Sequence, residues 1–270
     1  MSLPQMETPT RQFVFQRVYD MAALIEACVE DEGSLYELDW DDPEVVAGLV
    51  KFNRITLLHR YIYVMIAIKH RREYRKNADF YEAEQISEIE ALFDAYGITL
   101  LPHADFAARC LAEREALDPD EIFYEWFLSQ ESEFELLWEK LTEETFHLLF
   151  ANRAFLLNFN RAVASYLREG PPSISSEYLG SEGRIRRQSL PVWVRQAVFY
   201  RDHGRCVLCQ VDLSGLLSTD RVDHFDHMVP LAEWGTNDPC NIQLLCGACN
   251  LRKAAGEPVT GNRYSAWWRY

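Results

Sequence analysis

The sequence predicts an α+β protein in two parts, an all-α domain over residues 1–168 and a small domain of two strands and a helix over residues 185–270. Apolar residues recur at helical spacing through residues 11–168, and β-branched alternation is absent there. Residues 169–184 are rich in Pro, Gly and Ser, which is typical of a linker. A length of 270 residues also favours two domains over one.

The charge of the chain changes at the same place. Residues 1–170 carry 16 Lys and Arg against 32 Asp and Glu, a net charge of −16, whereas residues 171–270 carry 11 against 10, a net charge of +1. An acidic surface repels a phosphate backbone, so the first part is a poor platform for nucleic acid. We expect it instead to bind a protein partner, to self-associate or to regulate the second part.

Composition favours a soluble, cytoplasmic protein without a membrane partner. With 48% hydrophobic and 13% aromatic residues the chain can bury a sizeable core, but it has no apolar run of about 18 residues and no signal-peptide pattern at its start. Four of the seven cysteines stand in two Cys-x-x-Cys pairs. That spacing indicates metal ligation in a reducing compartment rather than a disulfide framework.

The first part is predicted to contain five to seven helices. Residues 44–76 form either one buried helix or two helices with a break near Asn53. Thr142, with Glu144 after it, is predicted to start the last helix, which runs to residue 168. His70 has no ligand-spaced neighbour and is interpreted as an ordinary surface or core histidine, and Cys28 and Cys110 are interpreted as buried apolar residues rather than reactive thiols. The other expected helices cover residues 11–32, 79–96, 104–117 and 119–139.

The second part is predicted to be a β-hairpin followed by a helix. A short helix over residues 191–201 leads into the first cysteine pair, strands are expected at 221–227 and 241–245, and a helix starts at Asn250 and contains Lys253. Two knuckles of the Cys-x-x-Cys kind complete the tetrahedral thiolate shell that structural Zn²⁺ prefers. The predicted zinc ligands are Cys206, Cys209, Cys246 and Cys249, with Cys240 outside the knuckle spacing.

Oxygen and imidazole groups lie between the two knuckles. Asp226 at the end of the first strand and Asn250 at the start of the helix could reach one divalent ion. His227 adjoins this position, and a neutral imidazole can take a proton from an attacking water. His224 could be an extra ligand or a substitute base, although a polar strand residue without such a role is the simpler interpretation.

Residues 189–253 resemble the HNH (ββα-metal) endonucleases whose motif is flanked by zinc knuckles. The resemblance rests on three stretches, Arg201-Asp202-His203-Gly204-Arg205-Cys206, Asp226-His227-Met228-Val229-Pro230 with Gly235, and Asn241-Ile242-Gln243-Leu244-Leu245-Cys246 followed by Cys249-Asn250 and Lys253. The helical part resembles no family that we recognise. The expected fold is therefore an all-α domain joined to a ββα-metal domain with a four-cysteine structural zinc.

The resemblance implies roles for individual residues. Asp226 and Asn250 would hold the catalytic ion, His227 would be the general base, and Asn241 would hold the loop that orients it. Lys253, and less strongly Arg252, would contact a substrate phosphate. An asparagine at the last position of the motif favours Mg²⁺ or Mn²⁺ over a softer ion.

Two functions follow from these expectations. The first is metal-dependent hydrolysis of DNA phosphodiester bonds to 5′-phosphate ends, regulated or targeted by the helical domain. By analogy, such a nuclease could serve in antiviral defence in bacteria. The alternative is a non-catalytic zinc module that binds nucleic acid or protein.

Overall fold

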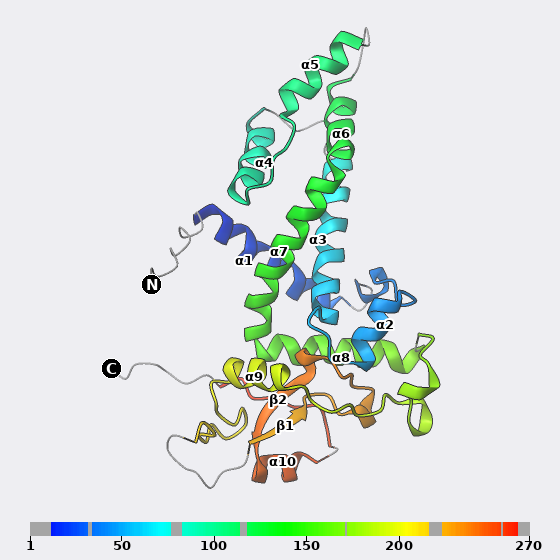
Figure 1. Cartoon of the computed structure of the whole chain (residues 1–270), viewed down its shortest axis with the longest axis vertical. Coiled ribbons are helices and arrows are strands. Elements are labelled where there is room, and N and C mark those ends of the chain that lie inside the picture. The colour runs from blue at the N-terminus through cyan, green and yellow to red at the C-terminus, as the bar shows by residue number, and fades with distance from the viewer. Residues whose placement is uncertain are drawn as a thin grey trace, which may run out of the picture. The chain divides into compact units, whose positions relative to one another are not determined.

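A computed structural model describes residues 12–31, 34–76, 83–113, 118–170, 172–215, 223–254 and 256–263. The chain divides into two compact units, residues 1–24 with 62–145, and residues 25–61 with 146–270. The division falls inside three helices. The helices and strands, drawn in Figure 1, are α1 (Gln12–Glu30), α2 (Pro43–Val50), α3 (Leu57–Lys76), α4 (Ala83–Ala95), α5 (His103–Glu113), α6 (Pro119–Ser129), α7 (Glu131–Ala151), α8 (Arg153–Glu169), α9 (Val192–Arg201), β1 (Asp223–His227), β2 (Ile242–Cys246) and α10 (Gly247–Lys253).

The first unit is all helical in its described residues, as predicted. Its core is aromatic: the rings of Phe123, Phe127 and Phe134 each meet the ring of Tyr74 edge to face. Such contacts add to the hydrophobic gain of burial. Among the described helices of the chain, none combines the length and the apolar composition needed to cross a membrane.

Helix boundaries differ from the prediction between residues 119 and 169. Thr142 does not start a helix, because it lies inside α7 and is buried. The helix that was expected from this point begins instead after Asn152, whose Oδ1 accepts a hydrogen bond from the amide of Phe155. A side-chain oxygen at this position satisfies an amide that has no partner within the helix. Helices α6, α7 and α8 therefore replace the two predicted ones.

The break predicted near Asn53 is present, since α2 ends at Val50 and α3 begins at Leu57. Asp42 caps α2 by accepting from the amide of Glu44, with Pro43 at the first helical position. The expected helix ends at residues 79–82 and 114–117 lie outside the described residues.

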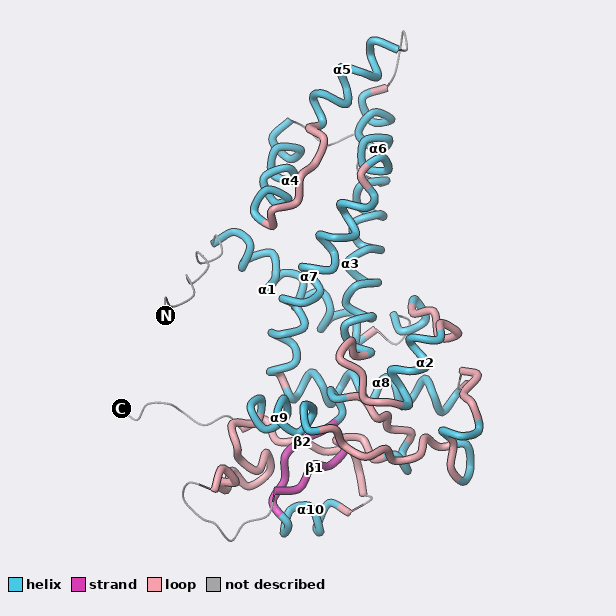
Figure 2. Tube along the Cα trace, viewed as in Figure 1, coloured by secondary structure: helices cyan, strands magenta, loops and turns pink. Residues whose placement is uncertain are grey.

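The second unit contains the β-hairpin. Strands β1 and β2 pair antiparallel with His227 opposite Ile242 and Asp226 opposite Gln243. They form the one sheet among the described residues, as Figure 2 shows. α10 packs on both strands and α9 packs on β2. Residues 221–222 of the predicted first strand lie outside the described residues. The hairpin-plus-helix prediction is confirmed.

The two compact units do not divide at residues 169–184, where the sequence composition suggested a linker. Helix α8 belongs to the same unit as the hairpin. Arg153, at the first position of α8 and 2% exposed, donates to the carbonyls of Gly261 and Arg263. Asn160 of α8 donates to the carbonyl of Cys240. Breaking such buried hydrogen bonds costs free energy, because the polar groups would be left without partners. These contacts therefore join α8 to the hairpin region.

The linker segment itself is folded. Leu179 and Ile185 form an isolated antiparallel bridge, Gly180 donates to the carbonyl of Arg184, and Arg186 donates to the carbonyl of Tyr178. A Pro- and Gly-rich composition is compatible with such a loop as well as with a flexible tether, because these residues favour turns in both cases.

We predict an acid-sensitive first unit because of His70. Burial lowers the pKa of His70 to about 3, and its Nδ1 accepts from Trp138 Nε1 at 2.8 Å. The unfolded chain, with a pKa near 6.5, binds the proton first, so the free energy of unfolding should fall by about 1.4 kcal/mol per pH unit between pH 6 and pH 4.

His70→Gln keeps an acceptor for Trp138 without a titrating ring and should remove that part of the pH dependence. Urea unfolding at pH 7, 5 and 4, followed by tryptophan fluorescence, measures it. The exposed His147 provides the control His147→Gln. The prediction would be contradicted if the free energy of unfolding depended on pH equally in the His70→Gln variant and in the parent.

Candidate metal and catalytic site

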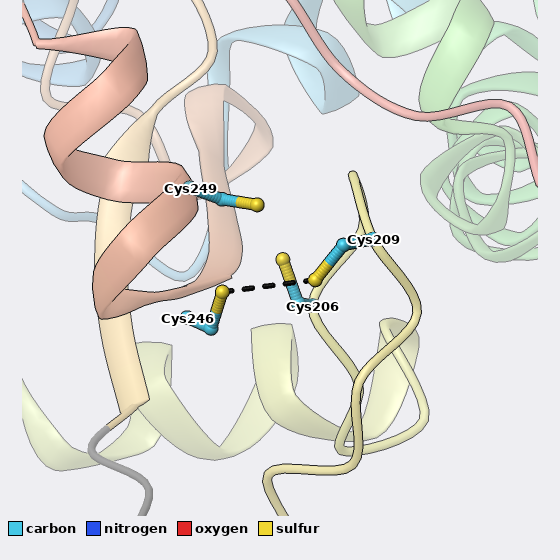
Figure 3. A group of neighbouring side chains, drawn as sticks. All are labelled: Cys206, Cys209, Cys246 and Cys249. Atoms are coloured by element: carbon cyan, nitrogen blue, oxygen red, sulfur yellow. Dashed lines mark hydrogen bonds between the residues drawn. The ribbon is translucent and has the colours of Figure 1, made fainter.

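The four predicted zinc ligands come together. Cys206 and Cys209 lie on the loop after α9, Cys246 ends β2, and Cys249 lies in α10. Their ligand atoms all lie within 4.8 Å of one another, with Cys209 Sγ 3.7 Å from Cys246 Sγ. Figure 3 shows the four sulfurs pointing toward one centre. Among the described residues this is the one group of three or more His, Cys, Asp or Glu side chains placed to hold a metal ion.

The cluster fits Zn²⁺ in donor type and in spacing. Sulfurs at tetrahedral positions about 2.3 Å from a zinc ion lie about 3.8 Å apart, close to the distance between Cys209 and Cys246. Burial and the neighbouring cysteines raise the pKa of Cys209 to about 12, so this thiol needs a cation to ionise at neutral pH. Cys206 and Cys249 also belong to the apolar core of the hairpin region. An ion held here would connect the knuckle loop to β2 and α10.

Asp226 and His224 lie on the side of β1 that faces α10, because side chains two residues apart share a strand face. The imidazole of His224 is close to the start of α10: a Cβ on Gly247 would lie 3.3 Å from His224 Nε2. Asn250 is half-buried in the same helix, one turn before Lys253. The structure thus places the His224 imidazole beside the start of the helix that contains Asn250.

Lys253 is engaged with the end of β1. Its Nζ lies 2.8 Å from Asp226 Oδ2 and donates to the carbonyl of His227 at 2.7 Å. The Lys253 side chain is 2% exposed and that of Asp226 is 13% exposed. Asp226 Oδ2 is buried, and the ammonium group of Lys253 is the cation that lies against it. A carboxylate oxygen that faces a cation in this way is also a suitable ligand for a metal ion.

His227 is 1% exposed. Burial, and then the nearby Arg187, lower the pKa of His227 to about 4, which keeps the ring neutral at pH 7. Its Nε2 lies 3.3 Å from Asn237 Oδ1, and its Nδ1 is buried without a partner. A neutral ring with one unpartnered nitrogen has the protonation state that a general base requires.

Asn241 holds the loop between the strands. Its Oδ1 accepts from the amide of Val229, and its Nδ2 donates to the carbonyls of Val229 and Thr236. Gly235 belongs to the same loop, and a Cβ atom at this residue would come 2.0 Å from the carbonyl oxygen of Val229. Only glycine permits that approach. These contacts fix the residues that follow His227.

Arg252 points to the cysteine cluster, since its Nη2 donates to Cys249 Sγ at 3.0 Å. It therefore adds positive charge beside the thiolates.

Sequence reasoning missed Asn237 and Asp238, both at most 1% exposed. The run Asn237-Asp238-Pro239 is typical of an exposed surface turn. No local sequence pattern indicates hydrogen-bond partners that lie more than 100 residues away.

The comparisons with known proteins agree with this geometry. Residues 213–256 match the family model described as HNH endonuclease. The C-terminal region contains an HNH domain. No curated protein and no solved structure matches the chain. The family match spans the paired strands, α10 and the second knuckle, so the HNH domain combines a hairpin, a helix and an adjacent four-cysteine cluster. The resemblance predicted from the motif is confirmed.

We predict that the HNH domain depends on zinc for its fold. Cys246→Ser removes one thiolate from the cluster and should reduce the zinc content from one ion per chain to well under half. Because structural zinc stabilises small domains by several kcal/mol, the unfolding midpoint should fall by at least about 10 °C. Elemental analysis and thermal unfolding measure the two effects.

Cys110→Ser is the matched control, since Cys110 is half-buried in α5 and lies outside the cluster. It should keep full zinc content. A Cys246→Ser protein that retains both its zinc and its unfolding midpoint would show that the cluster is not a zinc site.

Proposed function

We propose that this protein is a metal-dependent endonuclease that hydrolyses DNA phosphodiester bonds. One observation carries the proposal: within the region that matches the HNH family, a carboxylate and a buried imidazole are consecutive at the end of β1, and the imidazole has one nitrogen without a hydrogen-bond partner. These residues are Asp226, which is paired with Lys253, and His227, whose Nδ1 is the unpartnered atom. A metal-dependent hydrolytic site needs a carboxylate for the ion and a base with a free nitrogen.

Each residue then has a role. Asp226 and Asn250 would hold Mg²⁺ or Mn²⁺, with His224 as a further ligand. When bound, the ion supplies charge stabilisation at the phosphoryl oxygens. His227 takes the proton from the attacking water at Nδ1, the water oxygen bonds to phosphorus and the P–O3′ bond breaks. The products carry a 5′-phosphate and a 3′-hydroxyl group, whose proton comes from solvent. Asn241 keeps the loop after His227 in place.

Lys253 has two functions in this proposal. In the structure its ammonium group neutralises Asp226, which stabilises a carboxylate that is largely removed from water. With DNA and a divalent ion present, Lys253 is released to contact a substrate phosphate. Arg252 is the weaker candidate for a phosphate contact, because in the structure its guanidinium group donates to Cys249 Sγ.

The acidic helical region regulates or targets the nuclease in our proposal, through a protein partner or through self-association. Its charge makes direct binding to DNA unfavourable. We further propose a cytoplasmic protein of antiviral defence, on the analogy of small nuclease domains joined to helical modules. A pull-down with the full chain, tagged at its N-terminus, tests whether the helical region binds a protein partner.

A non-catalytic zinc module is the second candidate. The burial of His227 and the ion pair between Lys253 and Asp226 favour it, because neither group is open to solvent. Titration of the zinc-loaded protein with Mn²⁺ separates the two functions. A second, labile ion per chain supports the nuclease, and no ion beyond zinc supports the module.

We predict that His227→Ala abolishes cleavage. General-base catalysis contributes about 10²- to 10⁴-fold, so the rate of supercoiled plasmid relaxation with Mg²⁺ or Mn²⁺ should fall at least about 100-fold. His147→Ala, a change at an exposed histidine of α7, should cleave as the parent does. Equal rates for His227→Ala and the parent would show that His227 is not the base.

We also predict that Lys253 opposes ion binding at Asp226. Lys253→Met removes a positive charge 2.8 Å from Asp226 Oδ2. The affinity for Mn²⁺ should rise by about 10-fold, corresponding to about 1.4 kcal/mol. Isothermal titration of the zinc-loaded protein measures it, with the exposed Lys140→Met as control. Unchanged or weaker binding would place the ion away from this carboxylate.

A further inference from the structure

Asn237 contacts main-chain groups from two separate segments. Its Nδ2 donates to the carbonyls of Arg186 at 2.7 Å and Val50 at 3.1 Å, and its backbone amide donates to the carbonyl of Leu49 at 2.9 Å. The amide of Gln188 lies 3.5 Å from its Oδ1. The residue is 0% exposed. Both polar atoms of the Asn237 side chain and its backbone amide therefore have protein partners.

These contacts fix which end of the side-chain amide faces His227. Carbonyl oxygens can only accept and backbone amides can only donate. A rotated amide would direct its oxygen at the carbonyls of Val50 and Arg186 and its NH₂ group at the amide of Gln188. Three contacts would then become repulsive. The oxygen is consequently the atom that lies 3.3 Å from His227 Nε2.

The tautomer of His227 follows from the orientation of Asn237. An acceptor at Nε2 requires that this nitrogen carry the hydrogen, which leaves the lone pair of the neutral ring on Nδ1. Nδ1 is the buried nitrogen without a partner. The atom left free is thus the one able to accept a proton.

We propose that Asn237 is a positioning residue that holds His227 as the Nε2–H tautomer and directs Nδ1 into the reaction site. The inference rests on the proposed nuclease function and adds a dependence on residues outside the HNH match. Val50 ends α2 and Arg186 lies in the folded segment before α9, so the orientation of the base is set by two segments that precede residue 213.

A tautomer measurement tests the proposal independently of cleavage. The ring nitrogens of histidine-labelled protein distinguish Nε2–H from Nδ1–H by ¹⁵N chemical shift at pH 8, and loss of one signal set in His227→Gln assigns His227. We expect Nε2–H in the parent, a mixed or reversed tautomer in Asn237→Ala, and Nε2–H retained in Asn237→Asp. An Asp side chain keeps the acceptor for Nε2 while it loses both donors.

Cleavage kinetics should follow the tautomer. We expect kcat of Asn237→Ala to fall about 10- to 100-fold with KM changed less than about 3-fold, because a misplaced base affects the chemical step and not DNA binding. Asn237→Asp should recover part of kcat. Loss of folding stability alone would not produce this recovery together with the tautomer shift.

Asn160→Ala is a matched control. Asn160 is 3% exposed and its Nδ2 donates to two carbonyls, those of Leu156 and Cys240, but it does not contact His227. This variant should lose stability while His227 keeps the Nε2–H tautomer and kcat is unchanged. If Asn237→Ala fails to fold, the ¹⁵N shifts of His227 in the parent still report the tautomer.

Two results would overturn the inference. One is an Nδ1–H tautomer of His227 in the parent. The other is an Asn237→Ala protein whose tautomer and kcat both equal those of the parent. A parent that cleaves no DNA with either ion refutes the nuclease function instead, and the tautomer measurement then still decides the role of Asn237.

Discussion

The loop between β1 and β2 buries polar side chains that must find partners away from the loop. Asn237, Asp238 and Asn241 are each at most 1% exposed. An unsatisfied buried polar group costs about 1–3 kcal/mol, so three of them would consume much of the stability of a small domain. Asn241 is satisfied within the loop, but Asp238 accepts from the amide of Leu57, the first residue of α3. The carboxylate thereby caps a helix that begins 181 residues earlier. The HNH region is consequently one folding unit with helical segments that precede it.

A second network of buried polar groups also joins the HNH region to helices that precede it. The Asp202 carboxylate accepts two hydrogen bonds from Arg201 and one from the amide of Leu244, and Arg153 lies 3.7 Å from it. Two arginines around one carboxylate leave a net positive charge in the interior, and the carbonyl oxygens of Gly261 and Ile242 accept one hydrogen bond each from Arg153 and Arg201. Removal of Asp202 would leave both arginines buried without their counter-charge. Strand β2, α9 and α8 are therefore coupled by charge as well as by apolar packing.

The four-cysteine cluster was more predictable from the sequence than the surroundings of the proposed catalytic residues. Short-range patterns carry the cysteine spacing and the Asp226-His227 pair, because a knuckle and a strand end are local structures. The break before Leu57 and the hairpin could also be predicted from the sequence. Asn237 was not, since its partners Val50 and Arg186 are 187 and 51 residues away. The engagement of Lys253 with Asp226 was equally hidden, because helical periodicity gives the face of a residue but not the atom it contacts. Composition misled at residues 169–184, where Pro and Gly form a folded loop.

The compact units also change how the charge of the chain is understood. Residues 1–24 and 62–145 carry 10 Lys and Arg against 22 Asp and Glu, a net of −12, whereas residues 25–61 and 146–270 carry 17 against 20, a net of −3. The HNH-containing unit is thus slightly acidic rather than slightly basic, since it includes the acidic residues between 26 and 44. A net charge of −3 gives this unit no long-range attraction for a phosphate backbone. In the proposed nuclease function, recognition of DNA therefore rests on short-range contacts made by a few cations, one of them the ammonium group of Lys253 that is paired with Asp226.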